Sequence, residues 1–107
     1  MLKLAFRRIK PECEERLRRW FAELESRRAE VLETLVGERV RHEQAFVLET
    51  SDGPVLVWAA ELDDPEHAAA TFAQSPHAID REHARVLREC LDQTPPVTRV
   101  FDVAVAP

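Results

Sequence analysis

Two polar side chains interrupt helical stripes that are otherwise apolar, and they are the strongest candidates for chemistry in this sequence. Arg28 lies in the middle of an apolar stripe within segment 11–36, and His83 lies in the same way within segment 75–92. A guanidinium buried without a partner costs several kcal/mol, so Arg28 at that position requires a carboxylate or an anionic ligand. Together, Arg28 and His83 predict a polar pocket. A plainer interpretation stays open for each: Arg28 can extend its head group to water, and His83 can be a hydrogen-bonded core histidine.

His77, Asp80 and His83 follow one another at intervals of three residues, which places Asp80 within reach of either imidazole. A neighbouring carboxylate orients an imidazole and raises its basicity, as a general base near neutral pH requires. We therefore predict His83 and Asp80 as catalytic residues. The two histidines would point about 120° apart around a regular helix, so no metal site is expected there.

Arg28, Glu43 and His77 are predicted to bind the substrate. The candidate carboxylate partners of Arg28 are Glu43, Asp80 and Asp102. Glu43 follows His42 in a predicted strand, where adjacent side chains face opposite ways, so only one of the two can join the pocket. The requirement of Arg28 for an anion favours Glu43, whereas apolar residues on the same strand face as His42 favour His42.

Hydrophobic periodicity predicts the elements that must position these residues. Alternation of apolar and polar residues indicates strands, and apolar steps of three and four indicate helices. The predicted strands are 2–9, 39–50, 54–62 and 97–105, and the predicted helices are 11–36, 67–74 and 75–92. Gly37 is the expected end of the first helix, and Asp52-Gly53 is the expected hairpin turn.

This order of elements predicts an α+β fold of the ferredoxin-like, split βαβ type, in a single domain spanning residues 1–107. Its four-stranded antiparallel sheet would carry the helices on one face. Strand 54–62 is apolar on both faces, and exposing one of them would cost several kcal/mol at about 25 cal/mol per Å². A homodimer that packs through the open sheet face is expected, or else a monomer whose C-terminal segment covers that face.

Composition restricts the partners of the protein. The net charge is −5 and basic residues are interspersed with acidic ones, so neither nucleic acid nor an anionic membrane is an expected partner. No apolar run approaches the roughly 20 residues of a transmembrane helix, and the N-terminus lacks a signal-peptide core, so we expect a cytoplasmic protein. With two glycines in the chain, no phosphate-binding loop is expected, and no cofactor is implied.

Segments 25–49 and 75–91 resemble a family of uncharacterised bacterial and archaeal proteins of about this length. The motif-like positions are Arg28, Glu33, Thr34, Leu35, Glu38, Glu43, Ser75, His77, Asp80 and His83. By its plan the chain also resembles the dimeric α/β-barrel superfamily, which includes cofactor-free monooxygenases, polyketide cyclases, muconolactone isomerases and haem-binding enzymes. The resemblance implies a homodimer with a small pocket between helices and sheet in each subunit, and it implies no particular reaction.

Two functions remain open at this point. One is a metal-free enzyme, similar to a cyclase, isomerase or monooxygenase, that transfers a proton on an organic acid or carbonyl compound. His83 would then be the base or acid, and Arg28 would hold a substrate oxygen. The other is a non-enzymatic dimer, either a ligand-binding or a structural module, in which Arg28 and His83 belong to a structural network of charges.

Overall fold

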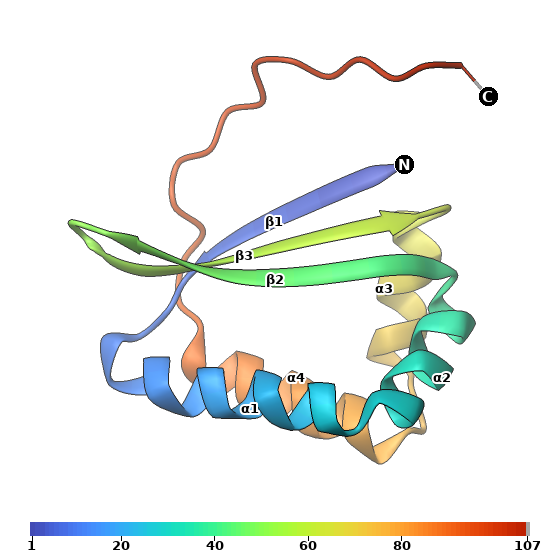
Figure 1. Ribbon diagram of the computed structural model, residues 1–107, viewed down its shortest axis with the longest axis horizontal. Coiled ribbons are helices and arrows are strands. Elements are labelled where there is room, and N and C mark those ends of the chain that lie inside the picture. The colour runs from blue at the N-terminus through green and yellow to red at the C-terminus, as the bar shows by residue number, and fades with distance from the viewer. Residues whose placement is uncertain (107) are drawn as a thin grey trace.

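The computed structural model describes residues 1–106 and shows a mixed α+β fold built on one three-stranded antiparallel sheet (Figure 1). The strands are β1 (Leu2–Arg8), β2 (Val40–Thr50) and β3 (Gly53–Leu62), in the order β1-β3-β2. The helices are the 3-10 turn η1 (Pro11–Cys13), α1 (Glu14–Ser26), α2 (Arg28–Glu38), α3 (Pro65–Ala73) and α4 (Ala78–Cys90). All four α-helices lie on one side of the sheet. In the described part of the chain, no helix is both long enough and apolar enough to cross a membrane.

The hydrophobic core is concentrated where α1 and α4 meet the sheet. Leu17 of α1 and Cys90 of α4 are fully buried there, together with Trp20 and Leu56. A second, smaller cluster lies near the opposite end of the sheet and contains Val40, Ala60 and Leu62. The core therefore fixes α1 and α4 firmly, while α2 and α3 meet the sheet through fewer buried side chains.

The helix predicted for 11–36 is broken into two at Arg27, which has φ −103° and ψ 41°. These angles lie outside the helical region, so α2 begins with a new direction and rises toward the sheet (Figure 1). The Arg27 guanidinium bonds Glu23, Glu30 and Glu82, which belong to α1, α2 and α4. One surface side chain therefore joins three helices at the break.

The end of α2 also differs from the sequence prediction. Gly37 is not the terminating residue, because the helix continues through Glu38 and ends at Arg39. Arg39 adopts the left-handed conformation, with φ 59° and ψ 39°, and its N–H donates to the carbonyls of Leu35 and Val36. This is an arrangement that glycine usually provides. The extra residues carry the side chain of Glu38 under the sheet, where it is buried.

The two faces of the sheet have different neighbours. On the side of the helices, Trp58 is paired with Ala5 and Ala45 across the strands. On the open side, Val57 is paired with Phe6 and Phe46. The large apolar side chains of this open face that remain half exposed or more are Leu2, Leu4, Phe46 and Leu48.

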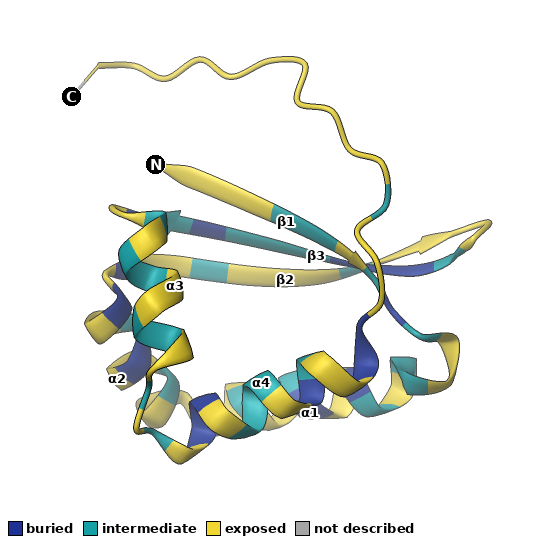
Figure 2. Ribbon diagram, turned by 180° about the vertical axis from the view of Figure 1, so that it is seen from behind, coloured by how far each residue is buried: buried dark blue, intermediate teal, exposed yellow. Residues whose placement is uncertain are grey.

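The fourth predicted strand is absent from the described residues. Segment 97–105 forms no strand and leaves the body of the protein on the open side of the sheet (Figure 1). It is exposed along its length (Figure 2), including Phe101 at 80%. The sheet therefore has three strands instead of the four predicted, because the chain pairs with the outer edge of β1 only as far as Gln93 and then turns away from it.

Candidate functional site

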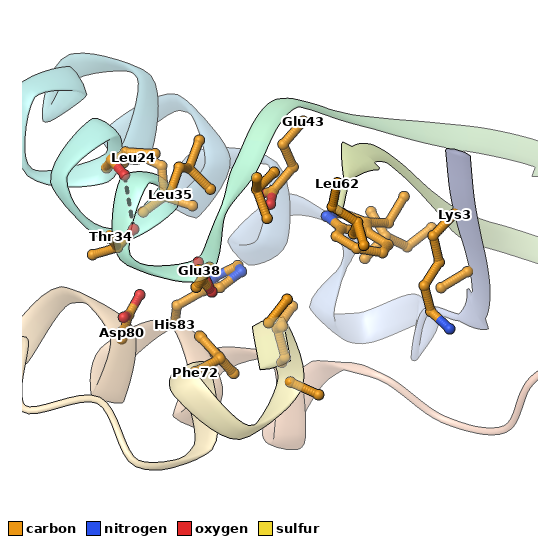
Figure 3. Close-up of a pocket in the computed structure, with 18 of the residues that line it drawn as sticks. Lys3, Leu24, Thr34, Leu35, Glu38, Glu43, Leu62, Phe72, Asp80 and His83 are labelled. Atoms are coloured by element: carbon orange, nitrogen blue, oxygen red, sulfur yellow. Dashed lines mark hydrogen bonds between the residues drawn. The ribbon is translucent and has the colours of Figure 1, made fainter. Parts of the chain in front are cut away.

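A cavity of about 360 Å³ lies between the helices and the sheet. Its walls are mostly apolar side chains, among them Leu56 and Leu62 from the two core clusters and Phe72 of α3. Its polar side chains come from separate elements: Glu38 from α2, Glu43 from β2, and Asp80 and His83 from α4 (Figure 3). An apolar cavity of this size with a few convergent polar groups is typical of a small-molecule site.

Three carboxyl groups of the cavity influence one another, and two of them have raised pKa values. Burial raises the pKa of Glu38 to about 7, with further contributions from the negative charges of Asp80 and Glu43. Burial also raises the pKa of Glu43, although a hydrogen bond from Trp58 opposes part of the shift. Within residues 1–106, no three acidic, histidine or cysteine side chains are arranged to hold a single metal ion. The mutual repulsion of the three carboxylates favours the protonated form of Glu38.

His83 is held by aromatic residues rather than by Asp80. Its ring is stacked with Trp20 at a centroid distance of 6.0 Å, and Phe21 and Phe72 contact it edge-on. The Trp20 indole donates a hydrogen bond of 2.7 Å to His83 Nδ1. Because indole can only donate, Nδ1 accepts, and the proton of the neutral ring is on Nε2.

The protonation of His83 differs from the expectation based on Asp80. Burial lowers the pKa of His83 to about 4, and the negative charge of Asp80 opposes this shift only in part. Desolvation of the imidazolium by the surrounding aromatic rings outweighs the attraction of one carboxylate. His83 is therefore neutral at physiological pH and is suited to donate a hydrogen bond from Nε2, not to act as a strong base.

The structure brings together some of the residues predicted from the sequence and separates others. His83, Asp80 and Glu43 all line the cavity, whereas His42 is paired with Glu61 on the open face of the sheet. Arg28 is exposed and lies outside the cavity, so the prediction that it points inward was wrong. The break at Arg27 shifts the phase of α2 by enough to turn Arg28 outward.

His77 also lies outside the large cavity. It precedes α4 and borders a smaller surface pocket together with Arg27, Glu30 and Glu33. Its predicted role in binding a substrate with His83 therefore has no support from their positions. Asp102, another predicted partner of Arg28, is in the exposed C-terminal segment and pairs with Arg99.

The cavity reaches the outer edge of the sheet along β1. Lys3, Ala5 and Arg7 line it from this strand, and both basic residues are exposed. Arg7 Nε donates a 2.6 Å hydrogen bond to the carbonyl of Asp92, which holds its head group at the end of the strand. The open side of the cavity is therefore next to an edge strand.

The sequence matches a family described as a family of unknown function, DUF6176, over residues 2–105. The chain belongs to this family. The match agrees with the resemblance to an uncharacterised family seen in segments 25–49 and 75–91. No curated protein and no solved structure matches the chain. Membership of DUF6176 assigns no reaction, so the chemistry must be argued from the cavity of this DUF6176 protein itself.

Two residues were not among the predicted site residues. Glu38 was only a motif-like position, since Gly37 was the expected end of the helix, although Glu38 continues the spacing of Val31 and Thr34 on the inner face of α2. Trp20 was assigned to the core, and its bond to His83 joins helices that are distant in sequence. Only the helical spacing of Glu38 was a signal available in the sequence.

Proposed function

We propose that the cavity binds a small, mostly apolar carbonyl compound and that Glu38 transfers a proton on it. The observation that carries this proposal is the buried Glu38 carboxyl in the cavity, whose pKa of about 7 is close to neutral pH. A group with such a pKa exists in both the acid and the base form and can therefore remove a proton and return it. This proposal keeps the metal-free enzyme considered from the sequence, with Glu38 in place of His83 as the base.

His83 supports the same chemistry as a hydrogen-bond donor. When Glu38 removes a proton from the carbon next to a carbonyl group, negative charge develops on the carbonyl oxygen. The Nε2–H of neutral His83 can donate to that oxygen, and its bond to Trp20 fixes the ring in advance. Return of the proton from Glu38 to a carbon of the enolate completes an isomerisation or an exchange.

The charges around the cavity select the class of substrate. Glu38, Glu43 and Asp80 are acidic, and Arg28, which was expected to hold a substrate carboxylate, is outside. The two basic residues of the lining, Lys3 and Arg7, are exposed at the edge along β1, whereas the acidic groups lie deeper, so a neutral ketone or enone is favoured in the interior over an organic acid. The mostly apolar walls accept such a molecule.

We expect the wild-type protein to catalyse exchange of protons next to the carbonyl group in cyclic ketones and enones of about ten heavy atoms, the size suited to a small pocket. Exchange in D₂O would be followed by proton NMR, and the rate should rise with pH and level off above an inflection near 7, the pKa of Glu38. Ligands that shift the NMR signals of Trp58 and His83 without exchanging would instead indicate the non-enzymatic binding module.

We further propose that two subunits pack through their open sheet faces, as in a dimeric α/β barrel. The support is the apolar centre of this face, where Phe6, Val57 and Phe46 are neighbours across three strands. Exposure of several such side chains would cost several kcal/mol at about 25 cal/mol per Å². A second copy supplies a matching apolar surface.

Replacing Phe46 with aspartate should convert this dimer into a monomer, because a charge would be buried without a partner at the centre of the interface. Sedimentation equilibrium should give the mass of two chains for wild type and of one chain for Phe46→Asp. Val36→Asp is the matched control, since Val36 is also exposed but belongs to α2 on the other side of the sheet. Wild type with the mass of a single chain would contradict the proposed dimer.

A further inference from the structure

The C-terminal segment 97–105 has the pattern of a buried strand but is exposed. The exposed fractions of Val100, Phe101, Val103 and Val105 are 91%, 80%, 74% and 98%. Phe101, Val103 and Val105 alternate onto one face of an extended chain, and Val100 is on the other. The face of Val100 also carries Thr98 and Asp102, so the segment has the pattern of a strand whose face with Phe101, Val103 and Val105 is covered.

The residues before this segment already pair with the outer edge of β1. Leu91 forms an isolated antiparallel bridge with Ile9, and Asp92 N–H donates to the Arg8 carbonyl at 2.7 Å. The Arg8 N–H in turn donates to the Gln93 carbonyl at 2.9 Å, so the pairing shifts by one residue at this point. Two residues further along, Pro95 would lie opposite Phe6, and Pro95 has no N–H to donate.

The pairing therefore stops at Pro95-Pro96, and the chain turns away from its own β1 (Figure 1). The outer edge of β1 from Leu2 to Phe6 is left without a neighbouring strand, since β3 is its only partner among the described residues. When two copies of the chain meet, the exposed apolar segment 97–105 of one copy can pair with the unpaired edge of β1 in the other, and the reverse.

We propose that segment 97–105 of each copy pairs with the outer edge of β1 in a second copy. This inference rests on the dimer proposed above. The segment leaves on the open side of the sheet, which is the side where the second copy would pack (Figure 1). Each sheet would then have four strands, in the ferredoxin-like arrangement expected from the sequence, with one strand contributed by the partner.

The exchanged strand would also complete the cavity. Lys3, Ala5 and Arg7 line the cavity from β1, so a strand beside β1 extends the sheet over the open side. Alternate side chains of the exchanged strand would face the helices of the second copy, and the others would face the opposite sheet. The site of each subunit would thus contain side chains from both copies.

The inference is tested in full-length chains by mixing two preparations. One is labelled with ¹⁵N, and the other carries Cys13→Ser and a spin label at Val103→Cys, while the buried Cys90 stays unreactive. We expect the spin label to broaden amide signals of the ¹⁵N chain most strongly over Leu2–Phe6, and progressively less across β3 to β2. The matched control is a label at Glu15→Cys on the helical side, which should leave β1 of the other copy unaffected.

Two results would overturn the exchange. Broadening of β1 that occurs only when the label and ¹⁵N are in the same chain would show that the segment folds back. Strongest broadening at β2 would show a different docking edge. Sedimentation equilibrium tests the dimer proposal separately. A protein that has the mass of two chains but lacks the expected broadening of β1 contradicts the strand exchange and not the dimer.

Phe101→Asp should also raise the dimer dissociation constant about tenfold or more, and an unchanged constant would contradict the exchange.

Discussion

Glu38→Gln should lower the rate of carbonyl proton exchange by about 10² to 10⁴-fold at neutral pH, the usual contribution of a positioned general acid or base. The amide of glutamine has nearly the same shape as the carboxyl group but cannot accept the proton. The substitution should also remove the inflection near pH 7, because that inflection belongs to Glu38. Both effects are measured by the deuterium exchange assay over pH 5 to 9.

Glu33→Gln is the matched control for this experiment. Glu33 is on the same helix and is exposed, so its replacement should leave the rate and the pH profile unchanged. Circular dichroism at each pH checks that both variants remain folded. If Glu38→Gln retains the wild-type rate, Glu38 is not the base, and the proposed reaction is wrong in its central residue.

The same substitution should stabilise the protein at high pH. The ordinary pKa of a glutamate, 4.5, applies to the unfolded chain, and the folded value is about 7. The contribution of protonated Glu38 is therefore fully present below pH 4.5 and is lost as the pH rises through 7. Partial access of the carboxyl to water reduces the effect, so we expect Glu38→Gln to be more stable than wild type by about 2 kcal/mol at pH 8.

Urea unfolding of both proteins at pH 4.5, 6 and 8 measures this difference. The gain should be almost lost at pH 4.5, where Glu38 is protonated in the folded protein and half protonated in the unfolded chain. His83 acts in the opposite direction, because its pKa falls from 6.5 to about 4 on folding and stability is lost as the pH falls through that window. His83 is common to both proteins, so comparing them at each pH isolates Glu38. A pH-independent difference would mean that Glu38 is not buried as a titrating group.

Local sequence patterns predicted the positions of most elements. Alternation placed three strands within about a residue of their observed ends, and Asp64 caps α3 as expected by accepting from the N–H groups of Glu66 and His67. These signals act within a few residues, so the sequence alone carries them. The start of α4 was placed slightly early, at Ser75-Pro76, whereas the helix begins at Ala78.

The error in the first long helix is its break at Arg27. The Arg27 side chain pairs there with Glu23 and Glu30 nearby and also with Glu82 of α4, which is distant in sequence. Arg28 was selected on the assumption of an unbroken helix. The break displaces the helical pattern by one residue, so that Arg27 and not Arg28 is the side chain at the junction of α1 and α2. A periodicity argument cannot detect such a shift, because both sides of the break keep their own regular spacing.

The site was predicted in part for the same reason. His83, Asp80 and Glu43 were found because a polar residue in an apolar pattern is visible in the sequence. The direction of the His83 pKa shift is not visible in the sequence, because the shift depends on the rings of Trp20, Phe21 and Phe72 that surround the imidazole. Burial by neighbours from other helices decided the protonation state.

The junction at Arg27 sets the angle between two helices that both border the cavity. Before it, α1 contributes Leu17 to the core and Phe21 and Leu24 to the cavity wall; after it, α2 contributes Glu38. Arg27 is the one residue between these helices, and its ion pairs with Glu23, Glu30 and Glu82 are partly exposed to water. Dissolved salt therefore screens the charges at the corner that determines where Glu38 enters the cavity.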